Sequence, residues 1–192
     1  MSQEVENQPY RTLESRYITQ TKWRSLREDR LEIGAGREIS YSYLEIPRAV
    51  FVVPLTEDGQ LVLIRQYRYP VRDWVLEVPA GSLETPDEDP LVAARRELLE
   101  EVGGECQKLI HLARFYSSSA HINLSSEVYL AVGVRLGQQH LEETELLERV
   151  ILPAREGLTL ARQGGITEGQ SAYAVLLAES RILALENDTW LK

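Results

Sequence analysis

The chain has 192 residues, which suits one sizeable domain or one domain with a small appendage, and its 43% hydrophobic content is ample for a buried core. A formal net charge of −9 argues against nucleic acid as a partner, because duplex binding relies on lysine and arginine to neutralise phosphates. No apolar run approaches the length of a membrane span, and residues 1–7 are acidic and polar rather than signal-like, so we expect a cytoplasmic protein. The single cysteine, Cys106, excludes an intrachain disulfide and a thiolate metal cluster.

The first part of the chain, residues 10–46, is predicted to form short strands and is poorly apolar. A small sheet that cannot build its own core must pack on the rest of the chain or on another subunit. Because Pro47 marks a boundary, we expect a β arm at 1–46 and a main domain at 47–192. The strands expected in the arm span 15–20, 23–33 and 38–46.

The main domain is predicted to hold a central sheet, because two segments rich in β-branched and aliphatic residues flank the hairpin-forming pair Asp58 and Gly59. A capping-box pattern at 167–170 precedes the expected C-terminal helix. The order of strands, helix, strands and helices predicts an α/β fold with a mixed sheet between helical layers. The expected strands span 49–55, 60–68, 74–80, 109–116, 127–134 and 148–152, and the expected later helices span 153–163 and 171–184.

A helix is expected at 90–102, because Asp89 can cap its start and Pro90 suits the first helical position. Gly103 can adopt the left-handed conformation that ends a helix. At about 100° per residue, three glutamates fall within an arc of roughly 100°, next to an apolar stripe. One side of this helix therefore packs and another is strongly negative.

The negative face consists of Glu97, Glu100 and Glu101. Glu97 and Glu101 stand at an i,i+4 spacing that destabilises a bare helix, and Arg96 can pair with Glu100 but neutralises only part of the cluster. A solvated helix face is the usual interpretation of such a pattern. A divalent cation is the alternative, because hard oxygen ligands on a rigid helix suit Mg²⁺ or Mn²⁺.

Residues 81–104 resemble the Nudix box, whose pattern is Gly, five residues, Glu, seven residues, Arg-Glu, an aliphatic residue, any residue, Glu-Glu, any residue, Gly and an aliphatic residue. Two departures occur: six residues separate Gly81 from Glu88, and Gly104 replaces the final aliphatic residue. The extra residue lies in the loop ahead of the helix, where insertions leave the ligand spacing unchanged. The matching residues are Gly81, Glu88, Arg96, Glu97, Leu98, Glu100, Glu101 and Gly103.

The resemblance implies the family's α/β/α sandwich and a metal-dependent attack on a diphosphate. It also implies that Glu88 pairs with Arg96 and fixes the loop on the helix. Gly81 would allow the sharp backbone turn that precedes the loop. The implied metal ligands are the carboxylates of Glu97, Glu100 and Glu101 and the backbone carbonyl of Ala80.

More of the chain is similar to one branch of the family, the ADP-ribose pyrophosphatases and related nucleotide-sugar hydrolases. The similarity lies in the N-terminal small sheet, the Arg-Gln-Tyr-Arg segment at 65–68 and the Leu-Glu-Val-Pro-Ala-Gly segment at 76–81. It implies that Arg68, with Arg65 beside it, contacts the diphosphate, whereas a solvated strand-end arginine is the alternative. The Ser-Pro-Gly-like loop of this branch is replaced at 116–121, which leaves other nucleotide sugars and dinucleotides open.

A hydrolase also needs a base to orient or deprotonate water, and the branch implies a glutamate on a late loop, here Glu143 ahead of Glu145, with a solvated acidic loop as the alternative. His121 is an alternative base or phosphate contact. Tyr17 and Trp23 of the arm could stack on a nucleobase, although packing in the core or in a dimer is the more usual role. Related enzymes exchange the arm between subunits, so we expect a homodimer.

The sequence therefore predicts a Mg²⁺-dependent enzyme that hydrolyses ADP-ribose or a similar nucleotide sugar to AMP and a sugar phosphate. A different diphosphate, such as GDP-mannose or a dinucleoside polyphosphate, is one alternative. A non-catalytic nucleotide sensor built on the same pocket is another, and the complete set of box glutamates argues against it.

Overall fold

The computed structural model describes residues 8–141 and 146–187, which form two compact units. The first unit comprises the chain up to Pro47 together with Tyr116–Ser125, and the second comprises Arg48–Phe115 and the chain from Ser126 onward. The segment Tyr116–Ser125 lies within the range that the sequence analysis assigned to the main domain. In the part of the chain that is described, no helix is long and apolar enough to cross a membrane.

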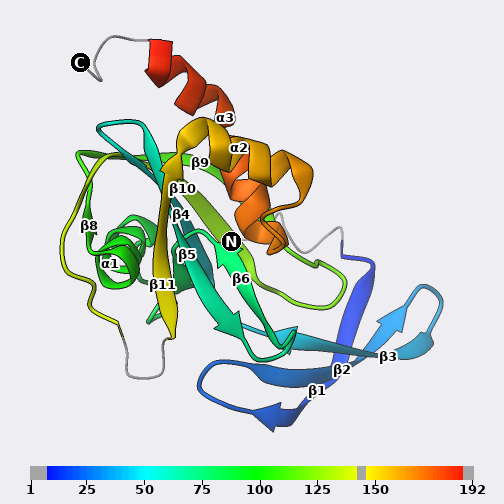
Figure 1. The fold of residues 1–192 in the computed structure, drawn as a ribbon. Helices are drawn as coiled ribbons and strands as arrows, with labels where there is room; N and C mark the ends of the chain where they lie inside the picture. Colours follow the sequence, from blue (N-terminus) through cyan, green and yellow to red (C-terminus); the bar gives the residue numbers. More distant parts are fainter. Residues whose placement is uncertain (1–7, 142–145, 188–192) are drawn as a thin grey trace. The chain divides into compact units, whose positions relative to one another are not determined.

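The first unit is a three-stranded antiparallel sheet in the order β1-β2-β3 (Figure 1). One face carries exposed ion pairs between neighbouring strands, such as Arg16 with Glu28, which is typical of a solvent-facing surface. The loop from the second half of the chain joins this unit through Leu44, whose N–H donates to the carbonyl of His121 at 2.9 Å. Its strands are β1 (Tyr10–Gln20), β2 (Ser25–Ile33) and β3 (Arg37–Glu45).

The second unit contains an eight-stranded mixed sheet in which β11, β5, β4, β10 and β8 lie side by side. The pair β4 and β10 is parallel, whereas β4 and β5 form an antiparallel hairpin at Gly59. The strands are β4 (Ala49–Thr56), β5 (Gln60–Arg68), β6 (Asp73–Glu77), β7 (Ala80–Ser82), β8 (Gly104–Glu105), β9 (Lys108–Tyr116), β10 (Ser125–Leu136) and β11 (Leu147–Pro153). The helices are α1 (Pro90–Val102), α2 (Ala154–Gln163) and α3 (Gly169–Asn187).

Helix α1 covers one face of this sheet, and α2 and α3 cover the other (Figure 1). Strand β4 is buried along its whole length, and its side chains alternate between the two faces. Val50 and Val52 belong to the core that includes Leu98 of α1. Phe51 points the other way and contacts Phe115, which in turn contacts Tyr173 of α3. The expected α/β fold with helices on both faces of a mixed sheet is therefore confirmed.

The start and the end of α1 are as predicted. Asp89 caps the helix through a bond from the Leu91 N–H to its carboxylate at 2.9 Å, and Gly103 adopts φ 63° at the other end. The strand expected at 74–80 was wrong as a single element. It breaks between β6 and β7, because the N–H of Val78 donates to the Ser171 hydroxyl instead of to a neighbouring strand.

The start of α3 also differs from the predicted capping box. The carboxylate of Glu168, rather than Thr167, accepts bonds from the backbone N–H groups of Gln170 at 3.1 Å and Ser171 at 2.6 Å. A carboxylate at this end is favoured by the positive end of the helix dipole.

Candidate active site

Helix α1 is attached to the short strand β7 by two of its charged side chains. Strand β7 extends the central sheet through its pairing with β4, and it ends at the loop that leads to α1. The backbone N–H of Ala80 donates to Glu101 Oε2 at 2.9 Å, and Arg96 Nη2 donates to the carbonyl of Ser82 at 3.0 Å. The carboxylate face of the helix therefore lies directly against residues 80–82.

Glu97 occupies the space over Gly81, between these two contacts. A Cβ atom on Gly81 would overlap the Glu97 carboxylate, so only glycine allows this approach. Glu97 Oε1 accepts a bond from Arg96 Nη1 at 2.7 Å, and Glu97 is 7% exposed. The need for glycine at this position thus comes from the carboxylate it faces.

Arg96 joins the helix to the preceding loop. Its guanidinium lies 3.7 Å from Glu88, 3.8 Å from Glu84 and 3.3 Å from Glu100. Burial lowers the pKa of Arg96, but the surrounding carboxylates outweigh burial and hold that pKa above its ordinary value. Glu88 also accepts the backbone N–H of Glu84 at 2.6 Å. The structure therefore brings Glu88, Arg96 and Glu100 together, and adds Glu84, which sequence reasoning did not select.

The carboxylates of α1 have the chemistry of a hard-cation site. Glu97 and Glu101 are 7% and 4% exposed, Glu101 binds the backbone of Ala80, and Glu100 is partly exposed on the same turn. Oxygen donors of this kind suit Mg²⁺ or Mn²⁺ rather than a soft metal. Within residues 8–141 and 146–187, no group of three His, Cys, Asp or Glu side chains is already arranged to hold a metal ion, and Glu97 and Glu101 bind Arg96 and the Ala80 N–H instead. The donors therefore fit a divalent cation in kind.

Arg68 lies at the end of β5 and forms a two-bond ion pair with Glu77, which is 3% exposed at the end of β6. Arg68 Nε donates to Glu77 Oε1 at 2.8 Å, and Nη2 donates to Oε2. This pairing, together with the charges of Glu101 and Glu168, outweighs burial and raises the pKa of Arg68. The guanidinium carbon of Arg65 lies 5.4 Å from the centre of the Trp74 ring.

Sequence reasoning missed Glu77 as the partner of Arg68. Residues 76–81 were used only as a matching segment. The signal that could have identified Glu77 is a charged residue among the apolar residues of a predicted strand. Glu77 binds Arg68, and a few residues later Ala80 and Ser82 contact α1. Residues 77–82 therefore run between the carboxylate helix and the arginine pair.

Glu127 forms a second buried acidic centre near the start of β10, and sequence reasoning did not identify it. It is 5% exposed and contacts Arg114 Nε at 2.6 Å, His111 Nε2 at 2.7 Å and Arg48 at 3.3 Å. Burial raises the pKa of Glu127, but hydrogen bonds from His111 and Arg114 outweigh it, so the pKa lies below its ordinary value. Because the Arg48 carbonyl accepts the N–H of Leu83 at 2.8 Å, this cluster borders the loop that follows β7.

Three of the predicted residues lie in the first unit. The Tyr17 hydroxyl donates to Glu45 at 3.0 Å, and Trp23 is 55% exposed with the ammonium of Lys22 4.1 Å from its ring centre. His121 contacts the Ser118 hydroxyl through Nδ1 at 3.0 Å. The candidate bases Glu143 and Glu145 lie outside the described residues.

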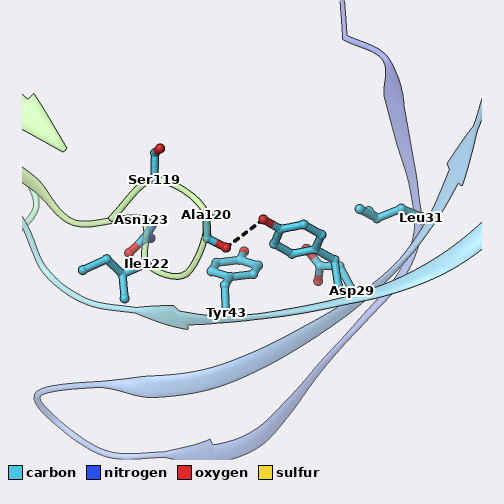
Figure 2. Close-up of a pocket in the computed structure, with 8 residues that line it drawn as sticks. Asp29, Leu31, Tyr43, Ser119, Ala120, Ile122 and Asn123 are labelled. Carbon is cyan, nitrogen blue, oxygen red and sulfur yellow. Dashed lines mark hydrogen bonds between the residues drawn. The ribbon is translucent and has the colours of Figure 1, made fainter. Parts of the chain in front are cut away.

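The first unit has a cavity of about 280 Å³ of its own (Figure 2). The hydroxyl of Tyr41, one of the lining residues, donates to the carbonyl of Ala120 at 2.8 Å. Burial raises the pKa of Asp29, but hydrogen bonds from Arg27 and Ser15 lower that pKa to below its ordinary value. The lining residues are Asp29, Leu31, Tyr41, Tyr43, Ser119, Ala120, Ile122 and Asn123.

Comparisons with known proteins identify the family of this chain. The family model of the NUDIX domain matches residues 45–165. A methanol dehydrogenase activator of Bacillus methanolicus is 30% identical over 86% of this chain and 90% of its own length. An ADP-ribose pyrophosphatase of Bacillus subtilis is 30% identical over 76% of this chain and 79% of its own length.

The fold has a counterpart among solved structures. That of an ADP compounds hydrolase superposes with a TM-score of 0.80 at 23% identity, covering 93% of this chain and 96% of the other. The resemblance to the Nudix box, and to the branch that contains ADP-ribose pyrophosphatases, is therefore confirmed. The chain belongs to the Nudix family of pyrophosphohydrolases.

Proposed function

We propose that this protein is a Mg²⁺-dependent hydrolase of ADP-ribose or a related nucleoside diphosphate sugar, and that it releases AMP, or the corresponding nucleoside monophosphate, and a sugar phosphate. The observation that carries the proposal is the docking of the Glu97 and Glu101 face of α1 on residues 80–82, beside the Arg68 pair. The similarity to an ADP-ribose pyrophosphatase over most of both chains supports this substrate class.

In this proposal, Glu97, Glu100, Glu101 and the backbone carbonyl of Ala80 hold the cation. When bound, such an ion neutralises charge on phosphate oxygens and makes a bound water more acidic. Arg68 binds the diphosphate through its fork of donors, and Glu77 orients that fork.

A glutamate of the late loop, Glu143 or Glu145, accepts a proton from the attacking water. The water oxygen forms a bond to phosphorus while the bridging P–O bond breaks, and the electron pair leaves with the departing phosphate. We take Glu143 as the base ahead of Glu145, and both stand in the acidic run at 142–145.

A substrate panel with product identification tests this proposal directly. We expect Mg²⁺-dependent release of AMP and ribose 5-phosphate from ADP-ribose, at higher kcat/KM than the release of products from GDP-mannose or a dinucleoside polyphosphate. Preferred cleavage of either of those compounds would keep the reaction class and replace the substrate. Nucleotide binding without turnover in Mg²⁺ would instead favour a nucleotide sensor.

The assigned ligands are tested by Glu101→Gln, which keeps the size of the side chain and removes its charge. We expect turnover to fall by orders of magnitude with the fold intact, because a principal cation ligand is lost. Glu156→Gln, on the exposed surface of α2, is the matched control and should retain activity. Near-normal turnover of the Glu101 variant would refute the ligand role.

We also propose that residues 1–46 act as a dimerisation arm. The support is the small three-stranded sheet of the first unit, which exposes large apolar side chains such as Ile18 at 51%. Light scattering should give twice the chain mass of 21.9 kDa, and a monomeric mass would count against the arm's role. If Tyr17 and Trp23 contact the nucleobase, Trp23→Ala will raise KM; if they pack in the dimer, it will lower the mass.

A further inference from the structure

The last turn of α1 leaves backbone carbonyls that its own residues cannot satisfy, as every helix end does. The turn has no basic residue of its own, so nothing on the helix balances the negative end of its dipole. The same turn carries the side chains of Glu100 and Glu101. What binds these carbonyls therefore also determines how firmly the proposed cation ligands are held.

The missing donors come from the segment that follows β10 and from β11. The His140 N–H donates to the carbonyl of Glu100 at 2.8 Å, and Gln139 Nε2 donates to the carbonyl of Glu101 at 2.6 Å. Arg149 Nη1 donates to the carbonyl of Val102 at 3.0 Å. Three successive carbonyls at the end of the helix thus receive a donor from outside the helix.

The contact continues past the helix and is tightly packed. Gly137 donates its N–H to the carbonyl of Gly103 at 2.6 Å, and Arg149 Nη1 also reaches the carbonyl of Gly137 at 2.9 Å. A Cβ atom on Gly103 would lie 2.5 Å from the carbonyl oxygen of Gln138, so backbone meets backbone here. Arg149 is paired with Ile64 in the central sheet. Its side chain therefore connects the helix end and this segment to the sheet.

We propose that Gln139 and Arg149 are positioning residues that fix the Glu100–Glu101 turn for cation binding. This inference rests on the proposed function, because it takes the carboxylates of α1 to be the cation ligands. Arg149 supplies the positive charge that the helix end lacks, and Gln139 binds the carbonyl of the same residue whose carboxylate contacts Ala80. Groups that hydrogen-bond to metal ligands change metal affinity strongly, and these two side chains act one step further out, through the backbone that carries the ligands.

The test is a Mn²⁺ titration followed by the electron paramagnetic resonance signal of the free ion, which measures binding without turnover. The variants are Gln139→Leu, Arg149→Met and Arg149→Lys in the full chain, with Glu101→Gln as the ligand control. Arg181→Met, on the exposed side of α3, is the matched control for loss of an arginine. Thermal unfolding of each variant shows whether the protein is folded at the titration temperature.

We expect Gln139→Leu and Arg149→Met each to weaken Mn²⁺ binding by about tenfold, within the range seen when such supporting partners are removed. Arg149→Lys should recover part of the loss, because it restores a cationic donor near the helix end. Arg181→Met should bind as the wild type does. A role limited to stability would lower the unfolding temperature and leave the affinity of the folded protein unchanged.

These outcomes distinguish failure of the positioning role from failure of the ligand assignment. Wild-type affinity in Gln139→Leu and Arg149→Met, with binding lost in Glu101→Gln, would overturn the positioning role and leave the proposed ligands standing. Absence of specific Mn²⁺ binding in the wild type, or unchanged binding in Glu101→Gln, would overturn the ligand assignment and this inference with it.

Discussion

Substituting Gly81 by alanine tests the central contact of the site. The new methyl group would overlap the Glu97 carboxylate, which is the mobile end of a side chain, so we expect Glu97 to move rather than β7. Glu97 would then lose its 2.7 Å bond to Arg96, and a lost bond to a buried charged group costs about 1.5–3 kcal/mol. A misplacement of about 1 Å in a catalytic group lowers activity by roughly a hundredfold, which sets the expected fall in kcat/KM.

The assay combines ADP-ribose hydrolysis at saturating Mg²⁺ with thermal unfolding. Gly169→Ala is the matched control, because a Cβ atom at Gly169 meets nothing within 4 Å at the start of α3 and should leave activity unchanged. We expect Gly81→Ala to stay folded with a modest loss of stability and a large loss of activity. Full activity at unchanged stability would refute the claim that the Glu97 carboxylate occupies this position.

Three further predictions concern side chains around this contact. Arg68→Met should lower the free energy of unfolding by about 1–3 kcal/mol, because it leaves the buried carboxylate of Glu77 without its partner. The loss is smaller than for a fully buried pair, since Arg68 is 43% exposed, and equal urea midpoints would contradict the prediction. Glu127→Gln should be less stable than the wild type at neutral pH, and urea midpoints should converge as pH falls below 4.5. The reason is that the unfolded wild type takes up a proton on this carboxylate near its ordinary pKa, whereas the folded protein does so only below its lowered pKa, so the stability conferred by the charge is lost over that interval. A pH-independent gap would argue against a lowered folded-state pKa of Glu127. Glu143→Gln should lower kcat more than Glu145→Gln without changing Mn²⁺ affinity, and the reverse order would assign the base to Glu145.

The helix that carries the box glutamates was predictable because its signals are local. Asp89 and Pro90 mark its start, Gly103 marks its end, and the spacing of the glutamates places them on one face regardless of the rest of the fold. The hairpin at Gly59 was predictable for the same reason, since its turn residues adjoin the strands they connect.

The partners of these residues were not predictable, because they come from distant parts of the chain. Val78 donates to the hydroxyl of Ser171, 93 residues later, at the point where the predicted strand breaks, and the next residue, Pro79, has no N–H for the ladder. The same holds for Arg149, which reaches the end of α1 from β11, 47 residues beyond Val102. Periodicity and composition describe what a segment can do by itself, and these contacts depend on which segments the fold places side by side.

The two departures from the box pattern show which parts of the motif tolerate change. The extra residue before Glu88 lies in a loop that bonds to itself, with the Glu88 N–H donating to the Thr85 carbonyl at 3.2 Å, so the helix beyond it keeps its register. Gly104 stands where the pattern has an aliphatic residue, and a Cβ atom there would lie 3.0 Å from Leu98 and 3.2 Å from Val134. Both changes fall outside the turn that presents the carboxylates. The reaction class can therefore be predicted from the helix, whereas the choice of substrate cannot.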